Sequence, residues 1–489
     1  MKNIVYYIAI ATVLLFASCA SELDTEPSGS QVSDEQLGEL IKENADLVLA
    51  PMMQGAVNYM HTGNHRATTN DRGFMVWNLG MDLQGNDMVL TKLTNWFADV
   101  YMFESIRAQT NAYTADRWFC YYKIVYQSNQ ILDLIPDDVT GKALVYKAQA
   151  LTYRALAYYY LMCVYQDDYM HGGKDKAGVP LYLTVEGAKG RTPSTEVYST
   201  ITTDLQNAIA LFEQEGYDPK SSTADIDQTV ANMVLARVAL TTGDYTTAAN
   251  AAGAVISAGY SLMNEEQYTT SGFQSTSLPE TIWGYTWAAS TSLGNRSFAS
   301  FMSITAVDNA NNKGIYMAID DQLYKQIAAT DYRKKNFNAT ETTVGEFTYP
   351  AYSNVKFNTP TYEADEIYMR LSEAYLLKAE AEARGGNSSA AQQTLYDLVS
   401  KRDSGYAKSS NTGEALLKEI FLQSRIELWG EGHEFFTNKR FNVGVDRTAS
   451  SNHTHKLVKA AGKEFTYQIP LSIELNSNPY INAADQNPL

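Results

Sequence analysis

The sequence predicts a mostly α-helical protein, built from repeated helix pairs and interrupted by long irregular insertions. Two observations lead to this fold class. Apolar residues recur at helical spacing in paired segments that are separated by short glycine-containing turns. Between these segments lie two long stretches that are rich in Gly, Asn, Thr and Ser and show no helical period. The chain of 489 residues, 45% of them hydrophobic, is long and apolar enough to bury a large core.

The first 18 residues are predicted to be a signal peptide and not part of the fold. Lys2 is the only charged residue among them, and an apolar run follows it over residues 4–17. A run of that length suits the apolar core of a secretory signal and is short for a membrane span. It leads into Phe16-Ala17-Ser18-Cys19, which resembles a bacterial lipobox and predicts that Cys19 is lipidated. A cleaved signal that leaves an unmodified cysteine is the alternative.

The charge and the aromatic content restrict the class of ligand. The formal net charge is −17, and loss of Lys2 with the signal peptide changes it to −18 (−17 − 1). Nucleic acid is bound by basic surfaces, so an acidic chain argues against a nucleic-acid partner and is compatible with a neutral ligand. Tyrosine is the dominant aromatic residue, with 34 copies against 6 Trp. Its apolar face and polar tip suit wet, amphipathic ligands, although a single Tyr more often packs between helices.

Two cysteines, Cys120 and Cys163, lie beyond the lipobox. We expect both to be free thiols that pack as small buried hydrophobic residues. They lie at almost equal distances from a predicted turn at Thr140-Gly141, so a disulfide across a helical hairpin is the alternative.

Two segments are predicted to be helix-turn-helix units. In the first, over residues 230–256, apolar residues at helical spacing stop at Gly243-Asp244-Tyr245 and then resume. In the second, over residues 371–399, the break is Arg384-Gly385-Gly386-Asn387. Alanines on the facing sides allow antiparallel helices to approach closely. Each pair buries its apolar face only against a neighbouring pair, which is typical of a tetratricopeptide-like repeat.

Three further helices are predicted before these units, over residues 117–135, 142–165 and 197–213. The third begins after Pro193, and Glu196 adds the acidic residue that favours a helix N-terminus. Together with a first helix near the N-terminus, they bring the scaffold to about four helix pairs.

Two long insertions, residues 50–113 and 261–365, are predicted to be irregular. Long loops in a compact domain are uncommon unless they have a function. The insertions contain four of the six tryptophans, and we expect some of these to contact a ligand. Trp283 is the exception, because the residues around it alternate as in a strand and place its side chain in the core.

The stretch from Arg425 to Phe436 mixes charged residues with large apolar ones and contains two glycines. An ordinary surface helix segregates charged and apolar residues on opposite faces. Here Glu427 and Glu431 alternate with Leu428 and Trp429, so we expect several of these charges to be buried and paired, and Trp429 to be structural. The glycines should break the helix.

This stretch and the C-terminal residues resemble the C-terminal signature of the SusD-like (RagB/SusD) proteins, which are surface lipoproteins of Bacteroidetes glycan-uptake systems. Proteins of this family commonly carry Arg where this chain has Glu434 and Asp where it has Thr437, so the chain resembles a divergent subgroup. The motifs that carry the resemblance outside Arg425–Phe436 are Tyr153-Arg154-Ala155, Val179-Pro180-Leu181, Arg191-Thr192-Pro193-Ser194, Lys439-Arg440-Phe441, Gln468-Ile469-Pro470, Glu474-Leu475-Asn476, Asn478-Pro479 and Gln486-Asn487-Pro488.

The resemblance covers essentially the whole chain and implies one SusD-like domain over residues 19–489. Its expected parts are a tether and first helix (19–49), an irregular insertion (50–113), helical repeats (114–260), an irregular ligand-side insertion (261–365), and a final repeat with the C-terminal signature (366–489).

The resemblance also implies a function. SusD-like proteins are non-enzymatic and need no cofactor. They are lipid-anchored and surface-exposed on the outer membrane, where they capture oligosaccharides and deliver them to a SusC-like TonB-dependent transporter. Two alternatives remain open: uptake of peptides by the same machinery, and a helical glycoside hydrolase, which needs two carboxylates across a cleft. The chain has no nucleophile elbow, P-loop, dinucleotide fingerprint or H-E-x-x-H motif.

For a carbohydrate site we predict Trp77 and Trp287 as aromatic platforms, with Asn295 and Arg296 as polar contacts. Both tryptophans lie in the insertions and are followed by small or polar residues. No metal site is predicted. His61 and His65 have helical spacing but lie among glycines and threonines. The run from Asp82 to Asp87 contains oxygen ligands suited to calcium, but its spacing is not that of an EF-hand, and we expect local turn capping.

Overall fold

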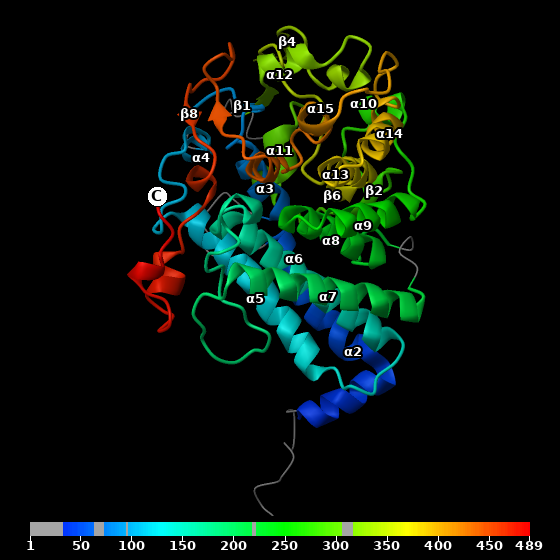
Figure 1. Cartoon of the computed structure of the whole chain (residues 1–489), viewed down its shortest axis with the longest axis vertical. Coiled ribbons are helices and arrows are strands. Elements are labelled where there is room, and N and C mark those ends of the chain that lie inside the picture. The colour runs from blue at the N-terminus through cyan, green and yellow to red at the C-terminus, as the bar shows by residue number, and fades with distance from the viewer. Residues whose placement is uncertain (1–32, 63–72, 94–95, 218–221, 306–315) are drawn as a thin grey trace, which may run out of the picture.

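A computed structural model describes residues 33–62, 73–93, 96–217, 222–305 and 316–489 (Figure 1). Cys19 and His65 lie outside these described residues. No helix among them is long and apolar enough to cross a membrane.

In the part of the chain that the structure describes, eight helices form the scaffold, and each packs against the next one in the series. This arrangement confirms the mostly α, helical-repeat fold with about four helix pairs. The eight helices are α2 (Asp34–His61), α5 (Ala112–Leu134), α6 (Lys142–Tyr165), α7 (Ser194–Glu215), α8 (Gln228–Thr242), α9 (Tyr245–Ser257), α13 (Leu371–Arg384) and α14 (Ser388–Val399).

Local signals in the sequence account for the helix ends. The helix predicted over 142–165 coincides with α6, and α7 begins directly after Pro193. At the turn between α8 and α9, Gly243 has a φ of 83°, which favours glycine, and the Asp244 side chain accepts from the backbone N–H of Thr247 at 3.0 Å. These caps act within a few residues, so the sequence is sufficient to place them.

The prediction that segment 50–113 is irregular is wrong. Helix α2 continues to His61, and α3 (Phe74–Asp82), β1 (Met88–Leu90) and α4 (Ala98–Met102) follow. All nine residues of α3 are buried. A helix that is buried on every side has no polar face, so its sequence lacks the amphipathic period by which helices are recognised.

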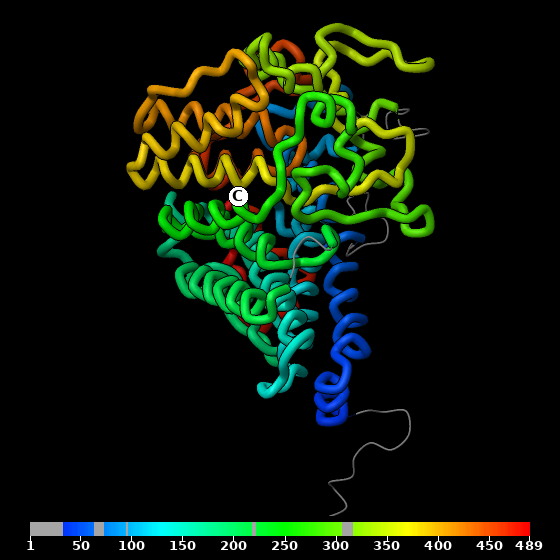
Figure 2. Tube along the Cα trace, turned by 90° about the vertical axis from the view of Figure 1, so that its right-hand side faces the viewer, coloured from blue at the N-terminus to red at the C-terminus, as the bar shows by residue number. Residues whose placement is uncertain are grey.

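The segment 261–365 consists of short elements joined by loops. It lies on the right in Figure 2, whereas α13, α14 and α15 lie on the left. Its elements are α10 (Glu265–Thr270), β2 (Thr281–Tyr285), η3 (Gly294–Arg296), α11 (Phe298–Met302), β3 (Met317–Ile319), α12 (Asp321–Gln326), η5 (Tyr332–Asn336), β4 (Thr342–Val344) and β5 (Phe347–Tyr349).

Among the described residues, two-stranded antiparallel sheets are formed by β1 with β3, β2 with β6 (Glu366–Arg370), β4 with β5, and β7 (Val445–Asp446) with β8 (Val458–Lys459). Pairing of β2 with β6 joins the irregular segment to the start of α13, which follows β6 without a break. The remaining elements are η1 (Tyr169–His171), α15 (Gly413–Glu427), α16 (Glu434–Arg440), η6 (Lys463–Phe465), η7 (Leu471–Leu475) and η8 (Ala483–Asp485).

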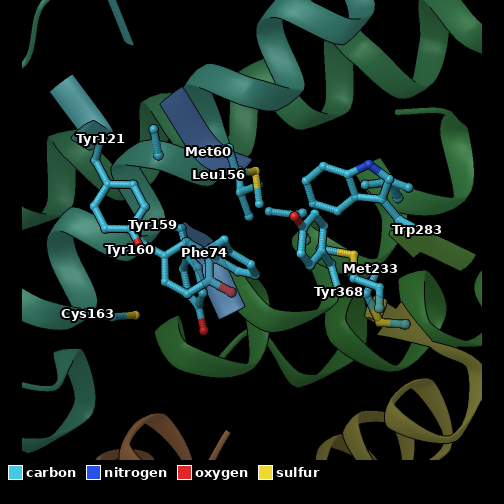
Figure 3. Packing of buried hydrophobic residues seen from close by; sticks show 14 of the residues in the cluster. Met60, Phe74, Tyr121, Leu156, Tyr159, Tyr160, Cys163, Met233, Trp283 and Tyr368 are labelled. Atoms are coloured by element: carbon cyan, nitrogen blue, oxygen red, sulfur yellow. The ribbon is translucent and has the colours of Figure 1, made fainter. Parts of the chain in front are cut away.

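Aromatic side chains fill the space between the repeats and the non-repeat segments (Figure 3). The rings of Tyr121 and Tyr160 stack with centroids 5.5 Å apart, and Phe74 meets Tyr160 edge-on at 5.3 Å. Trp283 is fully buried and packs edge-on against Tyr368 at 5.2 Å, which confirms its predicted place in the core. Much of the tyrosine content therefore serves packing.

Cys120 and Cys163 are both buried and both free, as predicted. They lie on α5 and α6, the two helices of the expected hairpin. Burial raises the pKa of the Cys163 thiol to about 11, so this thiol is neutral near pH 7.

Candidate functional site

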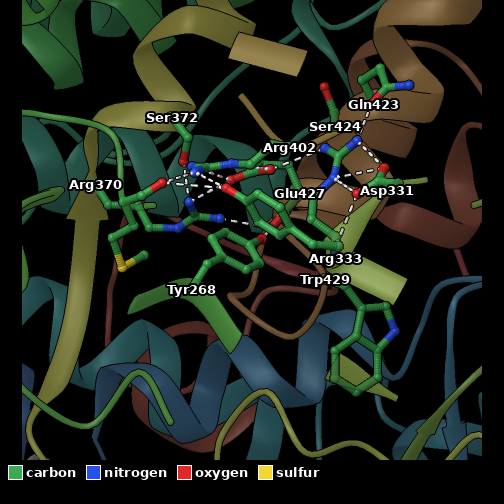
Figure 4. A network of polar contacts seen from close by, with 12 residues as sticks. Tyr268, Asp331, Arg333, Arg370, Ser372, Arg402, Gln423, Ser424, Glu427 and Trp429 are labelled. Carbon is green, nitrogen blue, oxygen red and sulfur yellow. Dashed lines mark hydrogen bonds and ion pairs between the residues drawn. The ribbon is translucent and has the colours of Figure 1, made fainter. Parts of the chain in front are cut away.

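The charges of the C-terminal signature are buried and paired, as predicted (Figure 4). Glu427 accepts from Arg333 at 3.0 Å, from Arg370 at 2.7 Å and from Arg402 at 3.1 Å. Burial alone would raise the pKa of Glu427, but the three guanidinium groups outweigh it and hold the pKa well below its usual value. Because these arginines come from η5, β6 and the segment after α14, the network fastens the non-repeat part of the molecule to the scaffold.

Trp77 lies in α3 and is completely buried. Its ring packs edge-on against Tyr121 at 5.6 Å, and its carbonyl oxygen accepts from Arg117 at 2.9 Å. The expectation of an exposed platform followed from the assignment of this segment as a loop. With no exposed surface, Trp77 has no face to offer a ligand in this structure and is a core residue.

Trp287 lies just beyond β2 and is only 5% exposed. Its ring meets Tyr285 edge-on at 4.7 Å. Glu366 is also buried in this region, where it accepts from the hydroxyl of Tyr368 at 3.4 Å, and burial raises its pKa to about 8. Most of the Trp287 side chain is therefore packed within the protein.

Asn295 and Arg296 lie in that loop, on the single turn η3. Asn295 is exposed and Arg296 is half-buried. Ser292 stabilises this turn. Its hydroxyl accepts from the N–H of Gly294 at 3.1 Å and donates to the carbonyl of Tyr362 at 3.5 Å. Of the four residues predicted to bind carbohydrate, these two have solvent-accessible surface for polar contacts.

Trp96 is the one tryptophan of the six that is not buried. It is half-buried, and its ring lies 5.4 Å from that of Phe301 on α11, the short helix that follows η3. Sequence reasoning placed Trp96 in the same insertion as Trp77 but had no signal to choose between them. Only their burial distinguishes them, and burial is decided by residues distant in the chain.

A group of hydroxyl and amide side chains lies close to the end of α11. Ser303 donates to the carbonyl of Thr359 at 2.7 Å, and Thr305 donates to the side-chain oxygen of Asn358 at 2.6 Å. Trp96 packs against α11, and η3 directly precedes α11; we call Trp96, Asn295 and Arg296, which keep exposed surface in this region, the Trp96 face. It combines a half-buried tryptophan with an amide and a guanidinium group, which can form hydrogen bonds with a polar ligand.

The histidine and acidic residues considered as metal ligands have other roles. His61 is buried, hydrogen-bonded to the hydroxyl of Tyr368, and stacked on Tyr285 with centroids 3.8 Å apart. Burial lowers the pKa of His61 to about 3, so it is neutral. No group of three or more His, Cys, Asp or Glu side chains in the described part of the chain is placed to hold a metal ion.

Asp82 and Asp87 make long-range contacts in place of the local turn caps that we expected. Asp82 accepts from the backbone N–H groups of Gly432 at 2.7 Å and Glu434 at 3.0 Å. Asp87 pairs with the guanidinium of Arg425, including a contact of 2.8 Å from Nε. The acidic run therefore anchors the signature region around α16.

Comparisons with known proteins agree with this architecture. A model of the SusD family matches residues 260–483, and a second family model, described as starch-binding and associating with the outer membrane, matches residues 31–240. A search of curated proteins found no match.

Several solved structures share the fold. A SusD-like carbohydrate-binding protein from Bacteroides vulgatus has a TM-score of 0.77 at 23% identity, over 90% of this chain and 98% of that one. A SusD superfamily protein from Bacteroides thetaiotaomicron has a TM-score of 0.74 at 21% identity, over 91% and 99%. Surface glycan-binding protein A from Bacteroides thetaiotaomicron, in complex with laminarihexaose, has a TM-score of 0.66 at 17% identity, over 90% and 99%.

The two family models together match nearly all of the described chain. The helices of the two matched regions pack against one another in one series. The chain belongs to the SusD-like (RagB/SusD) family of glycan-binding proteins associated with the outer membrane.

Proposed function

We propose that this protein captures oligosaccharides at the cell surface and delivers them to a SusC-like TonB-dependent transporter, without chemical conversion of the sugar. The observation that carries the proposal is the match of both halves of the chain to SusD-type family models, one of them described as starch-binding. The likeness in fold to a glycan-binding protein solved with laminarihexaose adds support. An acidic protein with a partly open indole suits a neutral, hydroxyl-rich ligand.

The Trp96 face is the proposed site of capture. An indole lies flat against the CH face of a sugar ring and loses little rotamer freedom when it binds. Trp96 would take this role, and Asn295 and Arg296 would contact sugar hydroxyls from η3. Trp287 would hold the loop that presents η3, because most of its ring is already packed.

Glycan binding is the direct test. Protein lacking residues 1–19 would be screened by calorimetry against neutral oligosaccharides that differ in linkage, including laminarihexaose, and against neutral peptides of similar size. We expect saturable binding of at least one oligosaccharide and unchanged saccharide length after incubation. Binding of peptides alone would favour the peptide alternative, and shortening of the saccharide would show a hydrolase.

Membrane attachment is proposed through lipid on Cys19, which lies outside the described residues. Several acyl chains on one cysteine hold a protein stably on a membrane, whereas one chain does so only marginally. We expect Cys19→Ala to release the protein from the membrane fraction or to block its processing. Equal membrane association of the variant and the wild type would refute lipid anchoring at this cysteine.

The transporter is the proposed partner. Affinity-tagged protein isolated from gently solubilised outer membranes should retain an outer-membrane TonB-dependent transporter in stoichiometric amount. A second tagged lipoprotein of similar abundance serves as the control. Equal recovery of the transporter with both baits would mean that the association is not specific.

A further inference from the structure

A concave surface lies apart from the Trp96 face. It has a volume of about 1030 Å³, at the upper end of the range for ligand-binding clefts. Its walls come from the loop after α9, from the start of α13, from α14 and from the segment around η5. Figure 1 shows α10 and α14 close together at the upper right, and α3 and α11 nearer the middle.

Three half-buried tyrosines, Tyr260, Tyr375 and Tyr396, line this surface, which we call the tyrosine groove. They come from three separate segments and face one space. The hydroxyls of Tyr375 and Tyr396 make no hydrogen bond with another side chain or with the backbone in the described part of the chain. The tyrosines of the core are buried, whereas each of these three keeps part of its surface exposed.

The groove is held in shape by a buried arginine at its floor. Arg402 donates to the carbonyl of Met263 at 2.8 Å and to the hydroxyl of Tyr332 at 3.0 Å, and its own carbonyl accepts from the N–H of Tyr332 at 3.0 Å. Arg402 therefore links the loop after α9 and the segment around η5 to the segment that follows α14. A site that is already ordered loses little conformational entropy when it binds a ligand.

The charges that line the groove are balanced. The charge of Arg402 is neutralised by buried ion pairs with Glu280 and Glu427. At the rim, Lys335 pairs with Glu265 at 2.5 Å. Asp397 and Lys401 remain, one of each sign. A balanced polar surface gives no net attraction for phosphate or for charged peptides, whereas tyrosine faces and hydroxyl groups match a neutral saccharide.

We infer that the tyrosine groove is a second saccharide-binding site, which takes a short stretch of a neutral polysaccharide whose other part occupies the primary site. This inference rests on the proposed function. Two sites on one rigid body would raise the affinity for a long chain well above that for a short one, because the second contact is intramolecular.

The test compares four proteins: wild type, Tyr375→Ala/Tyr396→Ala, Trp96→Ala, and Tyr480→Ala as a control. Tyr480 is 64% exposed and lies outside the groove. Each would be assayed by calorimetry with the hexasaccharide that binds the wild type in the screen, and by affinity electrophoresis in the parent polysaccharide. Thermal melting would show that each variant is folded.

We expect the double tyrosine variant to bind the hexasaccharide at the primary site as the wild type does, and to lose about tenfold in affinity for the polysaccharide. Trp96→Ala should weaken hexasaccharide binding but keep residual polysaccharide binding, and Tyr480→Ala should match the wild type. Unchanged polysaccharide binding by the double variant would overturn the inference and leave the proposed function intact. A wild type that binds no saccharide would overturn both.

Discussion

The carboxylate of Glu434 lies against the backbone of Gly85, where a Cβ atom would overlap it. The carboxylate also accepts from the N–H of Asp87 at 3.1 Å and from the N–H of Asn86. The Glu434 side chain therefore caps the loop of residues 85–87. Burial is the main reason that the pKa of Glu434 is raised well above its usual value.

This relationship predicts strong coupling between the two positions. We expect Gly85→Ala to destabilise the wild type by about 2 kcal/mol or more, because the new methyl group displaces the buried carboxylate. In a Glu434→Ala background the same substitution should cost less, with a coupling energy of roughly 1–3 kcal/mol. Urea unfolding of the four proteins of the cycle measures this. Additive effects would show that the contact does not limit position 85.

A second prediction concerns the buried pair of Arg237 on α8 and Glu373 on α13. Two hydrogen bonds of 2.6 and 2.7 Å join the side chains, and both residues are nearly inaccessible. We expect Glu373→Leu to cost about 3–5 kcal/mol, because it leaves a buried guanidinium without its partner.

The double variant Arg237→Met/Glu373→Leu should lose less stability than Glu373→Leu alone, since neither charge remains. Chemical denaturation of the three proteins provides the comparison. If Glu373→Leu unfolds at the same denaturant concentration as the wild type, the Arg237–Glu373 pair does not stabilise the packing of α8 against α13.

The third prediction is a pH dependence from Glu366, whose pKa burial raises to about 8 from an ordinary value of 4.5. Between these values the folded state holds a proton that the unfolded state has released. Its contribution to stability is therefore complete below pH 4.5 and is lost as the pH rises towards 8. Glu366→Gln cannot ionise and should not show this loss.

The difference in unfolding free energy between Glu366→Gln and the wild type should thus grow in favour of the variant by roughly 2–4 kcal/mol from pH 5 to pH 8. Urea unfolding at the two pH values measures it, and groups common to both proteins cancel. A constant difference would mean that Glu366 titrates normally.

The fourth prediction separates Trp77 from Trp96. Trp77→Ala should lower stability by about 3–5 kcal/mol, since it removes a fully buried side chain from the core. Trp96→Ala should leave the melting temperature nearly unchanged and weaken oligosaccharide binding by about 2 kcal/mol, or roughly 30-fold. Melting curves and calorimetry on both variants decide the roles. The assignment fails if Trp96→Ala binds normally.

The sequence by itself determined the repeat scaffold, because helix periods, caps and turns depend on residues within a few positions. The bounds of α6, the turn at Gly243 and the strand around Trp283 all follow from such local patterns. The signature from Arg425 to Phe436 likewise indicated paired buried charges, although their partners on η5 and β6 could not be named.

Only the tertiary structure decided which tryptophans face solvent. Trp77 and Trp96 stand in similar sequence surroundings, but every residue of α3 is buried, whereas Trp96 packs against Phe301 of α11 and is only half-buried. The tyrosine groove has the same origin, since its three tyrosines come from separate segments. Burial is a property of the assembled surface, and no local pattern encodes which distant residues will cover a side chain.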